Sequence, residues 1–509
     1  MLSKVLSFAL SGLKGFLVTV EVDLNTGLPG FELVGLPDAA VKEAKERVRS
    51  AVKNSGRFFP IAKITVNLAP ADKKKQGAAL DLAIAVGIIT SAGEKGKYIY
   101  GDYVFLGELS LDGGLKGING ILPIIISAKE QGYKNFIISK DNEKESSFVG
   151  GINVYAAASL NEVLNHLDQS KPLPKVEVTE YKENCENSKY SADLCYVKGQ
   201  ESVRRALEIA VSGGHNILMI GPPGAGKTML AKCIPSIMPD LTFEEALEVT
   251  KIHSIAGLLN DKDGIVYRRP FRTPHHSASF IGMTGGGSTA RPGEISLAHN
   301  GVLFLDEMPE YPRHTLEILR QPLEDRVINI SRINQIVEYP ASFMLVGSMN
   351  PCPCGNYGSG DLICKCGAAA IKNYLARLSN PLMDRIDLHV EVDSLKYGEL
   401  SKNELAESSE EVKKRVNKAR NIQRERFNKR RIITNAEMGE KELKEFCSLS
   451  PACEKLLEKS YEVLKLSARA RSRIIKVART IADLDFSEEI QEKHIAEAIN
   501  YRSLDRKYR

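Results

Sequence analysis

Tryptophan is absent from this sequence, and cysteine is rare, with nine residues among 509. Sparse, odd-numbered cysteines in a long chain exclude the disulfide framework of a small secreted domain and indicate a reducing compartment. Long apolar runs are also missing, because the longest candidate, residues 80–92, contains Asp81 and is too short to cross a membrane. No small-residue cleavage site follows the apolar start of the chain. These absences predict a cytoplasmic protein that has no membrane partner.

Neither sign of charge dominates the composition. The 69 Lys and Arg residues only slightly outnumber the 64 Asp and Glu residues, so a basic surface would have to be local. The chain is 43% hydrophobic and 26% charged, with 40 glycines and 22 prolines, which excludes a collagen and a largely disordered protein. At 56.0 kDa it exceeds the size that one hydrophobic core usually supports. We therefore expect about two to four globular domains.

The residue patterns divide the chain into segments. Strand-like alternation, as at 16–24 and 63–68, together with a helical pattern at 39–54, predicts an α+β domain at the N-terminus. A later region opens with a helical pattern at 200–211 and then alternates strands with helices, which predicts a parallel sheet. The predicted organisation is an N-terminal domain over 1–168, a linker over 169–193, an α/β core over 194–393, a basic connector over 394–434 and a helical domain over 435–509.

A phosphate-binding pattern lies near the start of the predicted α/β core. The apolar stretch 216–220 predicts a strand, and a helical run follows the glycine-rich segment, which is the context of a P-loop. Glycines let backbone N–H groups curl around phosphates, and the helix N-terminus adds partial positive charge. We expect Lys227 to reach the outer phosphates of ATP and Thr228 to supply a hydroxyl to Mg²⁺. The predicted nucleotide-binding residues are Gly221, Pro222, Pro223, Gly224, Ala225, Gly226, Lys227 and Thr228.

Two later strands are predicted to bring polar side chains to the same site. Four apolar residues at 302–305 predict a buried strand that ends in Asp306 and Glu307. We expect Asp306 to hold Mg²⁺ and Glu307 to polarise the attacking water. A third predicted strand, 343–347, precedes Asn350, which either lies beside the phosphates or simply starts a turn.

Four of the nine cysteines cluster in a loop rich in Gly, Asn and Ser, directly after the third strand. Four thiolates around a short loop can form a tetrahedral sulfur site for Zn²⁺. The one-residue gaps in the two Cys-X-Cys pairs are less usual than two-residue gaps, so buried free thiols or a redox pair are the alternatives. The predicted zinc ligands are Cys352, Cys354, Cys364 and Cys366.

These motifs resemble those of the YifB/ComM family of magnesium-chelatase-like AAA+ ATPases. The resemblance extends over essentially the whole chain and includes GLPGFELVGLPDAAVKEAKERVRSAV near the N-terminus, RPGEISLAHNGVLFLDE and SNPLMDRIDLHVEV. It implies a multidomain α/β protein. The implied parts are a Lon-protease-like α+β N-terminal domain, an AAA+ P-loop α/β core and a C-terminal helical lid of the magnesium-chelatase type.

The resemblance also implies roles for three residues outside the P-loop. Asn350 corresponds to the sensor-1 residue, Arg385 to an arginine finger, and Arg469 to a sensor-2 residue. A guanidinium can stabilise charge that develops on the γ-phosphate, and it must come from a neighbouring subunit if it lies on the far face. Taken without the resemblance, Arg385 would form a salt bridge with Asp384 or Asp387, and Arg469 would be part of a solvated helix face. The implied catalytic set is Glu307, Asp306, Asn350, Arg385 and Arg469.

The Lon-like domain is not expected to be a protease. A Ser-Lys mechanism needs a hydroxyl and an amine. Where such a protease has its nucleophilic serine, after a Lys-X-Gly-X step, this chain has Ala79, following Lys75 and Gly77, and the position of the activating lysine corresponds to Leu122. We therefore expect the domain to act in ring assembly or in contact with DNA.

The family resemblance implies a homo-oligomeric ring, a hexamer, that hydrolyses ATP and moves on single-stranded or branched DNA. Its expected role is a helicase that promotes branch migration in recombination and natural transformation. A magnesium-chelatase-type motor subunit and an ATP-dependent protein remodeller are the alternatives.

Two basic features are compatible with DNA as the partner. Residues 412–431 contain ten Lys or Arg and one Glu, a local charge of +9, although a basic helix is as often only a solvated face. The resemblance also implies that two insertions face a central pore, residues 272–293 and a predicted β-hairpin at 326–339, and arginines lie within or next to both. The arginines that could contact phosphates are Arg268, Arg269, Arg272, Arg291, Arg326 and Arg332.

Overall fold

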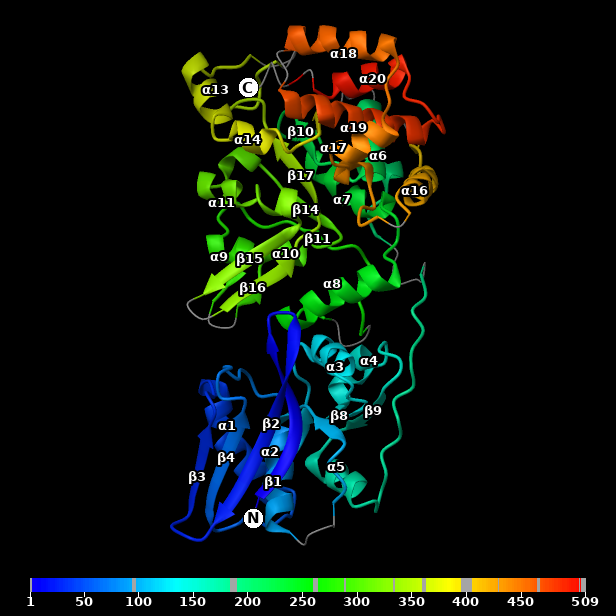
Figure 1. The fold of residues 1–509 in the computed structure, drawn as a ribbon. Coiled ribbons are helices and arrows are strands. Elements are labelled where there is room, and N and C mark those ends of the chain that lie inside the picture. Colours follow the sequence, from blue (N-terminus) through cyan, green and yellow to red (C-terminus); the bar gives the residue numbers. More distant parts are fainter. Residues whose placement is uncertain are drawn as a thin grey trace.

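An N-terminal unit and a larger unit built around a parallel sheet follow one another along the chain (Figure 1). The computed structural model describes residues 2–93, 98–183, 190–259, 264–287, 290–332, 335–358, 363–394, 405–428, 430–464, 467–502 and 504.

A mixed sheet forms the N-terminal unit, and within the described residues its strand order is β3-β4-β2-β1-β5-β8-β9. The antiparallel hairpin of β1 and β2 lies at its centre, with Val5 paired to Val20. Alternate residues of β2, among them Val18 and Val22, are fully buried, which explains the period-two pattern of the sequence. The strands are β1 (Leu2–Ser11), β2 (Lys14–Asn25), β3 (Gly30–Val34), β4 (Lys63–Ala69), β5 (Tyr103–Phe105), β8 (Asn135–Ser139) and β9 (Asn153–Ala157).

Helices cover both faces of this sheet. Helices α1 (Ala39–Asn54), α2 (Asp81–Ala92) and α5 (Leu160–Leu167) share a core with one face, and α3 (Ile121–Glu130) shares a core with the other. The apolar stretch that stood out in the sequence is α2, and it is buried on nearly all sides, as a helix without a polar face requires. Among the residues that the structure describes, no helix combines the length and apolar character needed to cross a membrane.

The second unit contains the predicted parallel sheet, with the order β11-β14-β17-β10-β18 in the described part of the chain. Strand β10 is central, and all four of its residues are buried. Helices α6 (Glu201–Gly213), α7 (Lys227–Ile237) and α8 (Phe243–Ala256) precede or follow it in the chain. The strands are β10 (Ile217–Ile220), β11 (Phe271–Arg272), β14 (Val302–Leu305), β17 (Met344–Met349) and β18 (Leu388–Glu391), and the predicted hairpin is formed by β15 (Val327–Arg332) and β16 (Gln335–Pro340).

The C-terminal helices share a core with this sheet. Ile474 and Ala478 of α19 belong to the same buried cluster as Ile217 of β10 and Phe304 of β14. One α-helix lies within the predicted connector, and four further α-helices follow it in the described residues. The helices are α16 (Ser409–Arg426), α17 (Glu440–Phe446), α18 (Pro451–Leu464), α19 (Ala468–Leu484) and α20 (Glu492–Asn500).

The tip of the β1–β2 hairpin reaches the second unit (Figure 1). Leu13 at the tip packs against a hydrophobic cluster of the second unit, and Gly12 beside it has a φ of +62°. A Cβ at Gly12 would lie 2.5 Å from Cγ1 of Val337 in β16, so a larger residue would collide there. Helix α3 also contacts α8, where the N–H of Gly120 donates to Ser254 Oγ at 2.9 Å.

The predicted linker contains no α-helix in its described part, 169–183 and 190–193, but it packs against both units. Lys175 forms a bridge with Tyr155 of β9, and the ring of Tyr181 stacks on Tyr267 with centroids 5.4 Å apart. The chain thus follows the N-terminal unit before entering the second one (Figure 1).

Candidate nucleotide-binding site

The loop between β10 and α7 has the backbone conformation of a phosphate-binding loop. Gly224 and Gly226 have φ values of +78° and +88°, which side chains other than glycine rarely adopt. A Cβ at either position would meet nothing within 4 Å, so the space beside the loop is open. Helix α7 begins at Lys227, and its free N–H groups face the same loop end.

Lys227 is the centre of a cluster of oxygen atoms. Its ammonium donates to the carbonyl oxygens of Gly221 at 2.6 Å and Pro222 at 2.9 Å, and to Asn350 Oδ1 at 3.2 Å. Burial lowers the pKa of Lys227, and the nearby carboxylates of Asp306 and Glu307 oppose that shift. The side chain of Asn350 therefore does more than start a turn, because it contacts the P-loop lysine.

Thr228 and Asp306 meet as the sequence predicted. Thr228 Oγ1 donates to Asp306 Oδ2 at 2.9 Å, although the two residues lie 78 positions apart. Glu307 is exposed and adopts the left-handed conformation with a φ of +51°, which costs a non-glycine residue about 1 kcal/mol. Such a strained residue at the end of a buried strand is typical of functional sites.

Ser348 belongs to this cluster, and the sequence analysis missed it. Its hydroxyl donates to the other carboxylate oxygen of Asp306, and it accepts the N–H of Glu307 at 3.1 Å. A signal was available, because Ser348 lies two residues before Asn350 and successive strand residues alternate between faces. Tyr374 of α13 (Ala368–Leu375) also lies here; burial raises its pKa to about 12, against a hydrogen bond from the backbone of Asn350. No sequence pattern marks Tyr374.

Arg385 lies away from this cluster. It is 6% exposed, and its guanidinium donates to Pro381 O at 2.6 Å and forms an ion pair with Glu324 of α12 (Pro322–Asp325). Its Nε is buried without a hydrogen-bond partner among the described residues. The salt bridge expected in the absence of a catalytic role thus exists, but with Glu324, which lies 61 positions away.

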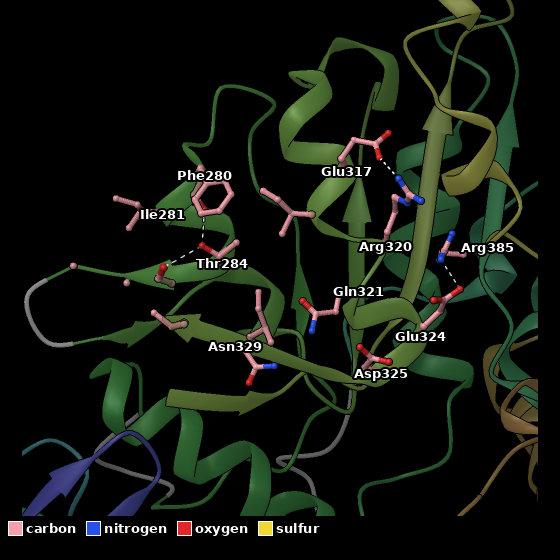
Figure 2. A pocket seen from close by; sticks show the side chains of 16 residues that line it. Phe280, Ile281, Thr284, Glu317, Arg320, Gln321, Glu324, Asp325, Asn329 and Arg385 are labelled. Atoms are coloured by element: carbon pink, nitrogen blue, oxygen red, sulfur yellow. Dashed lines mark hydrogen bonds and ion pairs between the residues drawn. The ribbon is translucent and has the colours of Figure 1, made fainter. Parts of the chain in front are cut away.

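Arg385 and Glu324 line a large open pocket (Figure 2). Its volume is about 970 Å³, and its wall includes Glu317 and Arg320 of the segment around α11 (Arg313–Ile318) and the exposed Phe280 of α9 (Phe280–Thr284). No described residue that lines this pocket belongs to the P-loop. The backbone of Arg385 is hydrogen-bonded to Asn216, just before β10, whereas the P-loop follows the other end of β10.

Arg469 is not brought to the nucleotide-binding loop by any described contact. It lies in the first turn of α19, after the N-cap Ser467, and its side chain is exposed. Within the described residues, no hydrogen bond or ion pair joins it to Lys227 or Asp306. Its role as a sensor residue stays a prediction.

The four predicted zinc ligands converge. Their sulfur atoms all lie within 4.8 Å of one another, and the Cys352–Cys354, Cys352–Cys364 and Cys354–Cys364 separations are 3.4, 3.7 and 3.6 Å. Tetrahedral Zn²⁺ with Zn–S bonds of about 2.3 Å holds its sulfurs about 3.8 Å apart, so the spacing fits this ion. Backbone N–H groups of Asn356 and Lys365 lower the pKa of Cys354 to about 6.

The cysteine loop packs on the P-loop itself. Gly355, next to Cys354, has a φ of +82°, and a Cβ added there would lie 2.4 Å from Cδ of Pro223. A glycine is therefore required by both the backbone and the close approach. This contact gives the cysteine loop a direct mechanical link to the nucleotide cradle.

Five of the ten Lys and Arg residues of the basic segment 412–431 form ion pairs within the described part of the chain. Arg420 is buried and donates to Val211 O at 2.9 Å. Several other cations form ion pairs: Lys413 with Asp240, Lys414 with Glu410, Arg415 with Glu208, Arg426 with Asp483 and Arg430 with Glu442. The net charge of the segment overstates the free positive surface of α16.

Three of the six arginines expected to contact phosphates have partners within the chain. Arg269 is 8% exposed and donates to Pro239 O at 2.6 Å, while Arg272 pairs with Glu294 at 2.7 Å. Arg326 pairs with Glu437 at 3.2 Å. Arg291 in β13 (Arg291–Pro292) is exposed and stays a candidate, as does the exposed Arg268. The side chain of Arg332 lies outside the described residues.

Comparison with known proteins agrees with this site. The family described as magnesium chelatase, subunit ChlI, matches residues 193–400, its ChlI-subunit companion matches 20–142, and the ChlI C-terminal family matches 406–502. Competence protein ComM of Haemophilus influenzae is 44% identical over 99% of this chain and 98% of its own length. Protein YifB of Escherichia coli is 44% identical over 96% of this chain and 94% of its own.

A magnesium-chelatase subunit ChlI, from Porphyra purpurea, is more distant, with 24% identity over 43% of this chain and 62% of its own length. The parallel sheet with flanking helices agrees with the AAA+ fold of this group. Such ATPases bind ATP with Mg²⁺, and the P-loop cluster provides the oxygen and amine groups for both. The chain therefore belongs to the YifB/ComM family of magnesium-chelatase-like AAA+ ATPases.

Proposed function

We propose that this protein is a ring-forming motor that hydrolyses ATP and acts on DNA, as a helicase that promotes branch migration in recombination and natural transformation. The convergence of Lys227, Thr228, Asp306 and Asn350 is the observation that supports the ATPase. Similarity over nearly the whole chain to a protein named for competence supports DNA as the moved polymer.

The proposed roles in hydrolysis follow from the contacts. Lys227 releases the carbonyls of Gly221 and Pro222 to bind the outer phosphates, since an ammonium gains more from phosphate oxygens than from neutral carbonyls. Thr228 and Asp306 hold the Mg²⁺ that accompanies ATP, and this ion neutralises charge on the transferred phosphoryl group. Glu307 orients and polarises the attacking water.

The remaining nucleotide contacts are assigned by position. Asn350 stays beside Lys227 and orients the water or the γ-phosphate. Arg385 lies in the pocket of Figure 2, away from its own P-loop, and we assign it to the nucleotide of a neighbouring subunit in a hexameric ring. Arg469 is assigned to the nucleotide on the lid side.

The four cysteines fit Zn²⁺ by donor type and by spacing. Bound zinc would supply a rigid crosslink of the loop and no step of the reaction. The Gly355–Pro223 contact would pass that rigidity to the P-loop.

The N-terminal segment 1–168 is proposed to be a Lon-like domain without protease activity, joined by the linker 169–193 to an AAA+ core over 194–393. Residues 394–434 are assigned as the connector and 435–509 as the lid. Extensive packing of α16 and α19 against α6 supports a lid that is closely coupled to the core.

The magnesium-chelatase alternative is less well supported, because similarity to a ChlI subunit covers 43% of the chain at 24% identity. An ATP-dependent protein remodeller would use the same nucleotide site. ATPase rates of the purified protein without polymer, with single-stranded DNA, with a four-way DNA junction and with an unfolded protein distinguish these functions. Stimulation by DNA is expected; stimulation by unfolded protein alone would contradict the proposal.

A further inference from the structure

The carboxylate of Asp387 lies two residues after Arg385 and is 4% exposed. It forms an ion pair with Arg473 of α19, accepts the N–H of Asn216 at 3.1 Å and lies 3.4 Å from Nδ1 of His215. Partners from the C-terminal helices and from the strand region of the core therefore meet at one buried charge.

The contact with the C-terminal helices is broader than this one ion pair. His215 Nε2 lies 2.8 Å from Oγ1 of Thr480, which is about two turns along α19 from Arg473 on the same helix face. The guanidinium of Arg502 also donates to the carbonyl of Ile386, and the N–H of His389 donates to Tyr501 O at 2.9 Å. The segment that follows Arg385 is thus held by the C-terminal region at three positions, Ile386, Asp387 and His389.

Asn216 connects this segment to the sensor strand. Its Nδ2 donates to the carbonyl of Arg385 at 2.9 Å, and its Oδ1 accepts the N–H of Leu345 in β17 at 2.8 Å. Its own carbonyl accepts the N–H of Asp387 at 2.9 Å. One side chain therefore fixes the position of the Arg385 backbone relative to the strand that leads to Asn350.

The charge on Asp387 holds the network together. Burial would raise its pKa, but the charge of Arg473 and the contact with His215 outweigh burial and lower the pKa of Asp387, so the carboxylate is ionised. A buried carboxylate that loses its cation is strongly destabilised, so Asp387 and Arg473 must move together. A displacement of α19 is therefore transmitted to the residues beside Arg385.

We propose that Arg473, Asp387 and Asn216 are positioning residues that couple the C-terminal helices of one subunit to its Arg385, and through Arg385 to the nucleotide of the next subunit. This inference rests on the proposed function of Arg385 across a subunit boundary. It adds a route by which the conformation of the C-terminal helices in one subunit changes the rate of ATP hydrolysis in the adjacent subunit.

Rings mixed from two kinds of subunit isolate the relevant interface. Donor subunits carry Glu307→Gln, which silences their own site, and keep Arg385; acceptor subunits carry Arg385→Ala and keep Glu307. Only an acceptor site completed by a donor Arg385 can hydrolyse ATP. Arg473→Gln is then added either to the donor or to the acceptor, and ATP turnover is measured in rings shown to contain both.

Arg473→Gln in the donor is expected to lower turnover roughly twofold to thirtyfold, the range of typical coupling effects, and in the acceptor to change it much less. Arg473→Lys in the donor should retain more turnover than Arg473→Gln. Arg471→Gln in the donor is the matched control, since Arg471 lies on the same helix and pairs at the surface with Glu454 at 2.9 Å. It should leave turnover unchanged.

The outcomes separate the two claims. No turnover in the parent donor–acceptor mixture would overturn the role of Arg385 itself. Turnover in the parent mixture that Arg473→Gln leaves unchanged, or lowers equally in donor and acceptor, would overturn the coupling. If Arg473→Gln donors fail to fold or assemble, the near-isosteric Thr480→Val, which removes the contact to His215, takes its place, and unchanged turnover with this donor would overturn the coupling.

Discussion

The two units of this protein each bury a lysine near a positive-φ glycine, and only Lys227 of these two lies in the candidate nucleotide site. Lys75 in the N-terminal unit is 0% exposed and donates to the carbonyl of Pro70, while Lys227 is 8% exposed and donates to two carbonyls of the P-loop. Burial lowers the pKa of both. Their local settings are therefore alike.

The difference lies in what surrounds each ammonium. Lys227 has Asn350 in hydrogen-bonding distance and the charges of Asp306 and Glu307 nearby, beside glycines that leave open space. Around Lys75 the acidic neighbour is Asp72, and the residue that the resemblance to Lon-type proteases aligns with their serine is Ala79. A buried lysine next to glycine marks a site only when acids and amides from distant strands converge on it.

Among the tests of this comparison, loss of the Glu307 carboxylate should have the largest effect on ATP turnover. Glu307→Gln is expected to lower ATP turnover roughly a hundredfold to ten-thousandfold, the usual contribution of a general base, because the water loses its polarising carboxylate. ATP binding should persist, since Lys227, Thr228 and Asp306 are unchanged. Steady-state hydrolysis and equilibrium binding of a fluorescent ATP analogue measure the two quantities. Normal turnover would remove Glu307 from the mechanism.

Exchanging each lysine for methionine tests the comparison itself. Lys227→Met should weaken ATP binding roughly tenfold to a hundredfold, the value of a charged hydrogen bond, and abolish most turnover. Lys75→Met should leave ATP binding unchanged and shift the free energy of unfolding by about 1 kcal/mol. Binding titrations and thermal melts of both variants provide the check; equal loss of ATP binding in the two would break the distinction between the lysines.

The cysteine loop offers a further test, because it packs on the P-loop that contains Lys227 in the second unit. Purified protein should contain close to one zinc per chain, and Cys354→Ser should release most of it, since three thiolates leave an open position. ATP turnover should fall severalfold, because Gly355 packs on Pro223 of the P-loop. Metal analysis decides the first point, and a zinc content near zero in protein prepared without chelator would contradict it.

Ser348 offers a finer test of the acidic cluster. Ser348→Ala removes the hydroxyl that contacts Asp306 and the N–H of Glu307, and one such hydrogen bond contributes about 1 kcal/mol. Turnover should therefore fall roughly fivefold at saturating ATP. Ser212→Ala, a buried serine of α6, is the control for loss of a hydroxyl from the same unit. Full turnover in Ser348→Ala would show that the contacts of Ser348 with Asp306 and Glu307 do not contribute to hydrolysis.

The smallest expected effect is on DNA binding, where loss of an exposed arginine is compared with loss of a lysine that has an ion-pair partner. Arg291→Ala should weaken DNA binding modestly and lower the salt dependence by about one counterion, because Arg291 is exposed in the insertion. Lys414→Ala should leave both unchanged, because Lys414 already pairs with Glu410 in the basic segment. Fluorescence anisotropy with labelled DNA at several salt concentrations measures this. A larger loss of DNA binding in Lys414→Ala than in Arg291→Ala would indicate that the basic segment contacts DNA.

The local features of the fold could be predicted from the sequence, and the long-range pairings could not. Helix α1 forms at 39–54 as its apolar spacing predicted, and the P-loop follows a buried strand. By contrast, Arg385 pairs with Glu324, and Arg415 with Glu208, which lies 207 positions away. No residue spacing encodes such contacts, because tertiary packing alone brings these side chains together.

The same reason explains why the sequence left the role of the basic segment 412–431 open. The acids that pair with its cations come from α6, the loop before α8 and the C-terminal helices. The site residues were easier to predict than the surface, since a P-loop and a strand ending in Asp-Glu carry their chemistry in sequence neighbours. Ser348 and Tyr374 carry theirs only through the fold.

Strand displacement on a branched DNA substrate tests the central claim most directly. A labelled four-way junction is incubated with the purified protein, Mg²⁺ and ATP, and the released strands are separated by electrophoresis. The account predicts ATP-dependent release by the unmodified protein and none by Glu307→Gln, which should still bind the junction. An unmodified protein that hydrolyses ATP and binds the junction but releases no strand would contradict it.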